Sequence, residues 1–165
     1  MAEAFNDKVL PADKAQRYAE VAQEIAAVLD GEPNVTARMA TVAAMLAASF
    51  DHFFWTGFYV VDPEKREELV VGPYQGTLGC LRIAFGHGVC GTAARTRRTQ
   101  VVADVNAFPG HSACDSRSVS EIVAPVVDAQ GRLLAVFDVD SETPAAFDAV
   151  DAEWLERILQ HSFAD

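Results

Sequence analysis

Residues 121–140 read EIVAPVVDAQGRLLAVFDVD, and this stretch contains two apolar runs on either side of a short polar segment. Val, Ile, Leu and Phe dominate both runs, as they do in buried strands. The five residues between the runs, 128–132, form a short connection with turn-forming residues. The stretch therefore predicts an antiparallel hairpin.

The hairpin determines which acidic side chains share a face of the sheet. If residues 129–130 form the loop, Glu121 lies opposite Asp138; if residues 130–131 form it, Glu121 lies opposite Asp140. Both registers place the three acids on one face, because directly opposed residues and residues two apart point the same way. A three-residue loop without a compensating bulge would send Glu121 to the other face.

Around the hairpin, the same composition recurs in four earlier runs, and helical spacing recurs in four segments. The predicted strands cover residues 53–61, 68–71, 80–85, 100–103, 121–127 and 133–139. The predicted helices cover residues 11–31, about 34–50, 89–98 and 147–163, the first ending at Gly31 and the second capped by Asn34. This order predicts an α+β fold with a six-stranded antiparallel sheet, helices on one face and ligand-binding loops on the other.

Length and composition indicate one globular domain. The chain has 165 residues, of which 50% are hydrophobic and 22% charged, and it shows no repeat or linker. We expect a single domain over residues 1–165, with N-terminal helices at 11–50, the sheet and active-site loops at 53–140 and a C-terminal helix at 147–163. An apolar stripe in the second helix is interpreted as core or as the interface of a homodimer: Met39, Val42, Met45 and Leu46.

The charge balance excludes two classes of partner. Thirteen basic and 24 acidic residues give a net charge of −11, so the protein repels nucleic acid phosphates and anionic membrane surfaces. The N-terminal sequence has no basic segment followed by an apolar one, and no apolar run reaches membrane-spanning length. We expect a cytoplasmic protein.

The three cysteines predict reactivity rather than cross-linking. Three are too few for a structural disulfide framework, and their spacing matches no standard zinc motif, so no metal is expected. Cys114 lies in a long polar loop, residues 105–120, where a thiol stays accessible as a nucleophile. Arg117 or His111 would favour its ionisation, whereas Asp115 would oppose it. The alternative is a buried cysteine that acts as a small hydrophobic residue.

Acidic and aromatic pairs point to one face of the sheet. Asp138 and Asp140 are two apart in an apolar run, so both project from the same face and need solvent, a cation or an amino group. The alternative is an exposed strand end with solvated acids. Trp55 and Tyr59 also share a face, although such a pair usually belongs to a core.

Between residues 54 and 142, the sequence resembles the free methionine-(R)-sulfoxide reductases, which are small GAF-type domains. The motifs that carry the resemblance are WTGFY at 55–59, VGPYQG at 71–76, GVCG at 88–91, FPGHSACD at 108–115, SEIVAPV at 120–126 and FDVDSE at 137–142. They occur in order and carry three cysteines at the family's positions. The sequence departs from the family pattern at His87, Ser112 and Ala124.

The resemblance implies a thiol reductase without a cofactor. Cys114 would attack the sulfoxide sulfur and become a sulfenic acid. Cys80 would then form a disulfide with Cys114, with Cys90 as an alternative resolving thiol. Thioredoxin would reduce this disulfide.

The resemblance also implies a substrate site. Glu121, Asp138 and Asp140 would hold the ammonium group or the sulfoxide oxygen of free methionine (R)-sulfoxide, and a protonated carboxyl group would help the oxygen to leave as water. Trp55 and Tyr59 would enclose the methyl group. The alternative function is that of a non-catalytic GAF domain that senses a small molecule, which predicts binding without turnover.

Overall fold

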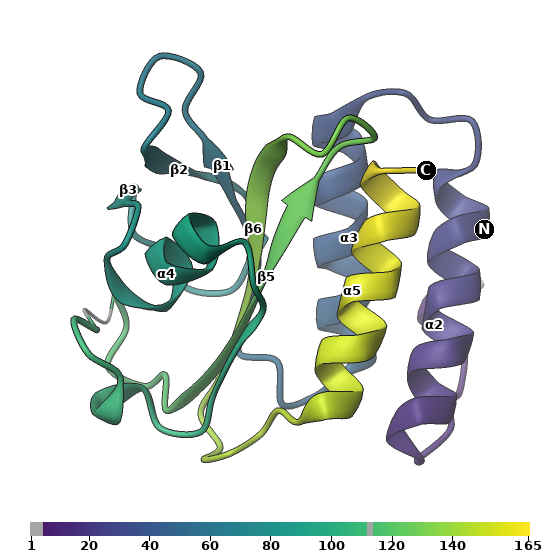
Figure 1. The fold of residues 1–165 in the computed structure, drawn as a ribbon. Helices are drawn as coiled ribbons and strands as arrows, with labels where there is room; N and C mark the ends of the chain where they lie inside the picture. The colour runs from purple at the N-terminus through teal and green to yellow at the C-terminus, as the bar shows by residue number, and fades with distance from the viewer. Residues whose placement is uncertain (1–4, 112–113) are drawn as a thin grey trace.

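A six-stranded antiparallel sheet forms the centre of the protein (Figure 1). The structure is a computed structural model that describes residues 5–111 and 114–165, so Ser112 and Ala113 of the predicted active-site loop lie outside it. The strand order is β3-β2-β1-β6-β5-β4. The strands are β1 (Trp55–Val61), β2 (Glu68–Gln75), β3 (Arg82–Ala84), β4 (Gln100–Val102), β5 (Ser120–Val127) and β6 (Leu133–Ser141).

Four longer helices of the described residues accompany the sheet, and a short 3₁₀ helix, η1 (Val105–Ala107), precedes the loop that contains Cys114. The four are α2 (Lys14–Leu29), α3 (Val35–Ser49), α4 (Gly88–Thr96) and α5 (Ala149–Phe163). Local chemistry begins three of them: Asp13, Asn34 and Asp148 each accept a hydrogen bond from a backbone amide in the first turn. The expected α+β architecture is confirmed, and β2 is longer than predicted because it continues through Pro73 to Gln75.

The hairpin of β5 and β6 has the second predicted register over most of its length. Glu121 lies opposite Asp140, and Val123 lies opposite Asp138. Because residues two apart on a strand share a face, Glu121, Asp138 and Asp140 project from the same side of the sheet. The prediction that the three acids share a face is confirmed.

The loop of this hairpin differs from both two-residue predictions. Asp128 and Arg132 are joined by a backbone hydrogen bond of 2.9 Å, which leaves three residues, 129–131, in the loop. Gly131 has φ +79°, the left-handed conformation that three-residue hairpin loops require at this position. A register shift between Val126 and Val127 compensates for the odd residue and returns Glu121 to the predicted face.

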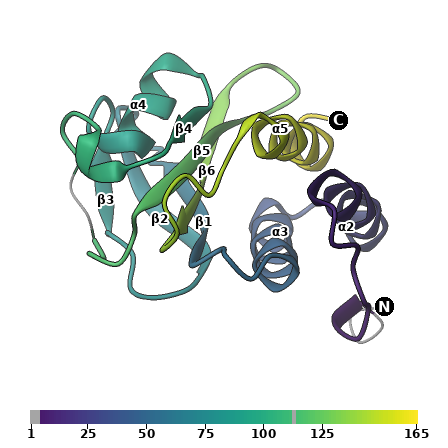
Figure 2. The ribbon, with the colours of Figure 1, turned by 90° about the horizontal axis from the view of Figure 1, so that it is seen from below.

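The two faces of the sheet are covered differently. Helices α3 and α5 pack on one face, and α2 lies outside them as a further layer (Figure 2). Phe58, Ile122 and Phe137 belong to the core on this face. The four-residue stripe of α3 is also core, so it does not supply an exposed dimer interface. The opposite face carries the loops as expected, but α4 packs there as well.

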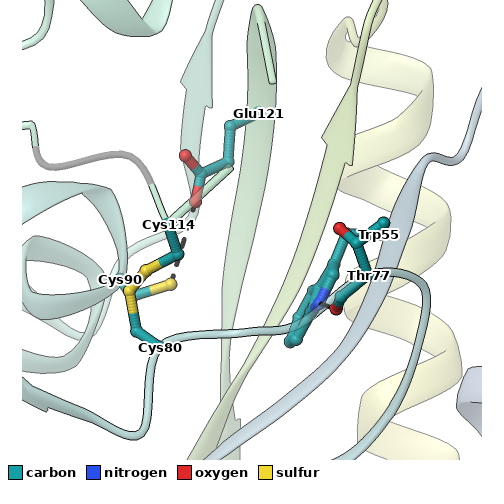
Figure 3. Close-up of a disulfide and its surroundings, with 6 residues drawn as sticks. All are labelled: Trp55, Thr77, Cys80, Cys90, Cys114 and Glu121. Carbon is teal, nitrogen blue, oxygen red and sulfur yellow. Dashed lines mark hydrogen bonds between the residues drawn. A yellow bond between two sulfur atoms is a disulfide. The ribbon is translucent and has the colours of Figure 1, made fainter. Parts of the chain in front are cut away.

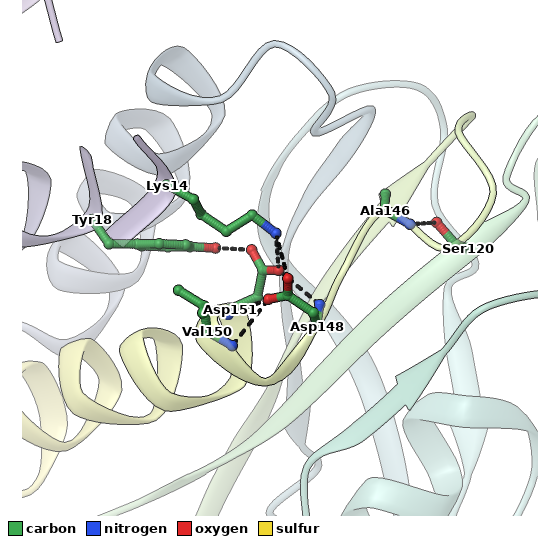
Figure 4. Close-up of polar contacts among 7 residues, drawn as sticks. All are labelled: Lys14, Tyr18, Ser120, Ala146, Asp148, Val150 and Asp151. Atoms are coloured by element: carbon green, nitrogen blue, oxygen red, sulfur yellow. Dashed lines mark hydrogen bonds and ion pairs between the residues drawn. The ribbon is translucent and has the colours of Figure 1, made fainter. Parts of the chain in front are cut away.

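A buried carboxylate connects α2 to α5 (Figure 4). Asp151 is fully buried and accepts hydrogen bonds from the Tyr18 hydroxyl at 2.6 Å, the Lys14 ammonium at 2.8 Å and the Asp148 amide at 2.8 Å. The Asp148 carboxylate in turn accepts hydrogen bonds from the backbone amides of Val150 and Asp151 in the first turn of α5. The buried Asp151 carboxylate and the buried Tyr18 hydroxyl satisfy one another, so this network fixes the outer helix to the rest of the fold.

No helix in the described part of the chain has the length and apolar character that crossing a membrane requires.

Candidate active site

A cavity of about 310 Å³ lies on the face of the sheet that α4 covers. All eight residues that the sequence selected line it: Trp55, Tyr59, Cys80, Cys90, Cys114, Glu121, Asp138 and Asp140. They come from β1, β5, β6, α4 and two loops, and the sequence separates them by up to 85 positions. The volume falls at the lower end of the range for small-molecule sites.

Three carboxyl groups form the floor of the cavity. Glu121 is 5% exposed and Asp138 is 4% exposed, while Asp140 is half-buried at the end of β6. None of the ion pairs within residues 5–111 and 114–165 involves any of the three. Such acids are not the solvated strand end that the alternative interpretation expected.

Burial and mutual repulsion make these carboxyl groups hold protons. Burial raises the pKa of Glu121 well above its usual value, and the charge of Asp138 raises it further. Burial likewise raises the pKa of Asp138 and of Asp140, each with a second contribution from another acid of the cluster. The raised pKa values suit the cluster to proton donation, and a cationic ligand would offset the repulsion among its charged forms.

Cys90 extends the acidic cluster with a buried thiol (Figure 3). It lies on α4, and its thiol donates a hydrogen bond of 3.8 Å to the Glu121 carboxylate. The next residue, Gly91, lets α4 pack closely on the end of β3, since a Cβ there would lie 2.4 Å from the Ala84 carbonyl oxygen. Burial, followed by the charge of Asp138, raises the pKa of the Cys90 thiol well above its usual value.

The other two cysteines form a disulfide at the mouth of the cavity (Figure 3). Cys80 and Cys114 are 34 residues apart in sequence, and their Cα atoms are 5.5 Å apart. Cys114 is exposed and Cys80 is half-buried. The interpretation of Cys114 as a buried hydrophobic residue is therefore wrong, and a protein partner can reach the disulfide.

Stacked aromatic rings form one wall of the cavity. The rings of Trp55 and Tyr59 stack with centroids 5.4 Å apart, and both side chains are buried. Trp55 lies opposite Asp140 in the pairing of β1 with β6, which sets the apolar wall beside the acidic floor. Sequence reasoning missed Tyr74, whose ring stacks on Trp55 at 4.9 Å, although it lies within the quoted VGPYQG motif.

A polar contact joins the two loops that carry the disulfide, and the sequence interpretation did not predict it. The Thr77 hydroxyl donates a hydrogen bond of 2.9 Å to Asp115, while the Trp55 indole donates one of 2.9 Å to the Thr77 carbonyl. Asp115 also binds Arg117 at 2.7 Å, and these contacts lower the pKa of Asp115. Thr77 has no motif of its own, so only the fold reveals its role.

Neither residue that was expected to favour ionisation of Cys114 is a free positive charge: Arg117 is paired with an acid, and His111 is neutral. Arg117 binds Asp115, and its guanidinium lies 4.9 Å from the Phe54 ring centroid. Burial lowers the pKa of His111, so its imidazole is neutral at pH 7. The His111 Nε2 atom is buried and has no hydrogen-bond partner in the described part of the chain.

The family model for the GAF domain matches residues 31–162, in agreement with the fold, and this match defines the class of protein. The free methionine-R-sulfoxide reductase of Saccharomyces cerevisiae is 41% identical over 79% of this chain and 75% of its own. That of Escherichia coli is 36% identical over 89% of this chain and 87% of its own. The X-ray structure of free methionine-R-sulfoxide reductase from Neisseria meningitidis in complex with its substrate is 44% identical with a TM-score of 0.89, covering 94% of this chain and 91% of that one.

The chain belongs to the free methionine-R-sulfoxide reductase family of GAF domains. It is an oxidoreductase.

Proposed function

We propose that this protein reduces free methionine (R)-sulfoxide to methionine by thiol chemistry. The observation that carries the proposal is the Cys80–Cys114 disulfide at the mouth of a cavity with an acidic floor and an aromatic wall. A disulfide in this position is the oxidised product that a two-thiol reductase must form once per turnover.

Cys114 is the nucleophile in this proposal. Its sulfur attacks the sulfoxide sulfur, the oxygen passes to Cys114, and methionine leaves with the Cys114 sulfenic acid as the second product. A protonated carboxyl group of the acidic floor donates a proton to the sulfoxide oxygen during this step. The raised pKa values of Glu121, Asp138 and Asp140 support this role.

Cys80 resolves the sulfenic acid. Its thiol attacks the Cys114 sulfur, the disulfide forms, and the hydroxyl group leaves as water. Cys90 serves as the alternative resolving thiol, although it is buried and hydrogen-bonded to Glu121. A reduced thioredoxin then exchanges its dithiol for the Cys80–Cys114 disulfide, which the exposure of Cys114 supports.

The acidic floor and the aromatic wall divide the substrate between them. Glu121, Asp138 and Asp140 hold the ammonium group of the free amino acid, whose charge offsets their repulsion. Trp55 and Tyr59 enclose the methyl group. Peptide-bound methionine sulfoxide has no such ammonium group, so this arrangement selects the free amino acid.

We also infer that residues 1–165 act as one GAF domain in the cytoplasm, where thioredoxin keeps thiols reduced. The homodimer stays a prediction, with light scattering as its measurement.

Turnover of the separate R and S epimers tests the proposal. With thioredoxin, thioredoxin reductase and NADPH, we expect NADPH oxidation with the R epimer of free methionine sulfoxide and almost none with the S epimer. Omitting thioredoxin is the control for direct reduction. Binding of the R epimer without NADPH oxidation would instead support the sensor function.

A further inference from the structure

Cys90, Glu121 and Asp138 bring together three side chains of the kind that bind metal ions. One sulfur and two carboxylate oxygens lie within 4.8 Å of one another, and all three residues are buried. They come from α4, β5 and β6, so no local spacing motif contains them. The earlier expectation of no metal considered only the spacing of cysteines and histidines.

An unpaired oxygen indicates that this cluster accepts a cation. The Oδ1 atom of Asp138 is buried and has no hydrogen-bond partner among the residues that the structure describes, and Asp138 itself is 4% exposed. Leaving a carboxylate oxygen buried and unpaired is costly, and a cation at this point removes that cost. A carboxyl oxygen of Asp138 lies within 4.8 Å of the Cys90 thiol and of a Glu121 oxygen, and this combination of ligands suits zinc.

The thiol of Cys90 is available whether the enzyme is oxidised or reduced. The disulfide joins Cys80 to Cys114 and leaves Cys90 free. Its sulfur contacts the other two candidate ligands, with a 3.8 Å hydrogen bond to Glu121 and a further side-chain contact with Asp138. A metal bound here would replace these contacts within the cluster.

We propose that Cys90, Glu121 and Asp138 bind one thiophilic divalent cation of the zinc type. The Cys90 thiol and any protonated carboxyl group of Glu121 or Asp138 release their protons to solvent as the sulfur–metal and oxygen–metal bonds form, and neither partner changes oxidation state. One consequence rests on the proposed function: Glu121 and Asp138 are also assigned to the substrate ammonium group. The metal and the substrate therefore exclude one another, and zinc inhibits the reductase competitively.

The oxidised protein is the appropriate form in which to test this site. Its disulfide prevents the sulfur atoms of Cys80 and Cys114 from binding metal as thiolates, which leaves Cys90 as the free thiol. We expect calorimetry to show one equivalent of Zn²⁺ bound to the oxidised wild-type protein. Co²⁺ serves as a spectroscopic probe and should produce a sulfur-to-cobalt charge-transfer band in the near ultraviolet. Cys90→Ser should remove this band, and Asp138→Asn should remove the stoichiometric Zn²⁺ binding.

Asp115→Asn is the matched control. Asp115 lines the same cavity, but Thr77 and Arg117 already engage its carboxylate. We expect this variant to keep both the Zn²⁺ stoichiometry and the cobalt band. A thermal unfolding transition for every variant shows that each one is folded.

Absence of stoichiometric Zn²⁺ binding in the oxidised wild-type protein overturns the proposal, whatever the variants do. Persistence of the cobalt band in Cys90→Ser also overturns it. Inhibition kinetics on the reduced enzyme then test separately whether zinc competes with the substrate. Stoichiometric binding with non-competitive inhibition supports the metal site and contradicts the placement of the substrate ammonium group.

Discussion

At the scale of single residues, the candidate site is distinguished by three acidic side chains in buried or half-buried positions, where a charged carboxylate is unfavourable. Glu121, Asp138 and Asp140 gather on one face of the sheet, and no cation of the described chain pairs with them. A hydrophobic cluster would stabilise the fold better, since buried charged groups contribute little or nothing to stability. The position of these acids accords with the proposed roles in proton donation and in binding an ammonium group.

The two linked cysteines have different expected phenotypes. Cys114→Ser should abolish reduction, because no sulfenic acid can form on it. Cys80→Ser should still release about one methionine per chain in a single turnover without reductant, since the first step needs only Cys114. It should then cycle poorly with thioredoxin. Quantifying methionine after one addition of substrate decides this, and full single-turnover activity in Cys114→Ser would move the role of nucleophile to Cys90.

Blocking the substrate amino group should cause a large loss of efficiency. N-acetylation removes the charge, and each lost charge-assisted hydrogen bond contributes roughly 1.5–3 kcal/mol, or about tenfold or more in kcat/KM. Comparing kcat/KM for free and N-acetylated methionine (R)-sulfoxide measures this effect. The methyl ester of the free compound is the control, because it keeps the ammonium group. Equal efficiency for all three compounds would refute the ammonium site.

At the scale of elements, the proposed catalytic cycle requires that two loops meet. One loop joins β2 to β3 and carries Cys80, while the other precedes β5 and carries Cys114. The hydrogen bond from Thr77, which does not line the cavity, to Asp115, which does, holds these loops together. It acts on the position of the resolving thiol and leaves the acidic floor unaffected.

Thr77→Val should therefore slow resolution without slowing the first step. Losing one hydrogen bond of about 1 kcal/mol should reduce the rate of disulfide formation by about fivefold. Methionine release in the first turnover should stay at the wild-type rate. Rapid quenching with a thiol-blocking reagent and mass spectrometry measure both rates.

Thr99→Val is the matched control for this loss of a hydroxyl group. Thr99 donates a hydrogen bond of 2.7 Å to Glu156 and does not line the cavity. Its disulfide should form at the wild-type rate. An equal slowing in both variants would contradict the role of Thr77 in joining the loops.

At the scale of the whole molecule, the stability of the helical layers depends on Asp151. Replacing it with Ala leaves the buried Tyr18 hydroxyl without its partner and removes the shorter of the two ion pairs of Lys14, which keeps Asp148 at 3.3 Å. This change should cost about 2–4 kcal/mol in the free energy of unfolding. Glu153→Ala on the same helix removes only an exposed ion pair with Arg157 and should cost at most about 0.5 kcal/mol. Urea unfolding measures both, and equal losses would contradict a structural role for the buried network.

The acidic floor should also make stability depend on pH. Because the pKa of Glu121 is raised on folding, the folded state binds more protons than the unfolded chain above the unfolded pKa of about 4.3, and stability falls as pH rises. Glu121→Gln removes the carboxyl group that causes this decrease in stability with rising pH. Its free energy of unfolding relative to wild type should therefore increase from pH 5 to pH 8, by about 1.4 kcal/mol for each pKa unit that folding adds.

This difference between two oxidised proteins cancels the contributions of titrating groups that do not interact with Glu121. Asp138 and Asp140 are coupled to Glu121, so the measured change reports on the cluster. Urea unfolding at a series of pH values measures it. A variant whose relative stability stays constant or falls with rising pH would show that Glu121 is not held protonated by the fold.

Much of the fold follows from short-range patterns in the sequence. Alternation along 133–139 correctly predicts that Asp138 and Asp140 share a face, and Asn34 correctly predicts where α3 begins. These predictions succeed because strand pleating and helix capping depend on neighbouring residues. The sequence left the register of the β5–β6 hairpin open, because the register depends on which residues form the loop and on whether the loop contains two residues or three.

The sequence by itself determined the α+β fold, the shared face of the acids and, through its ordered motifs, the family. The tertiary structure alone decided that Cys90 contacts Glu121 across 31 positions, that Thr77 joins Asp115 across 38 and that Asp138 keeps an unpaired oxygen in their midst. The physical reason is the distance along the sequence over which each kind of interaction acts. Propensity, capping and periodicity act within a few residues, whereas these contacts exist only because α4 and two loops pack onto a sheet whose β-bulge restores the register.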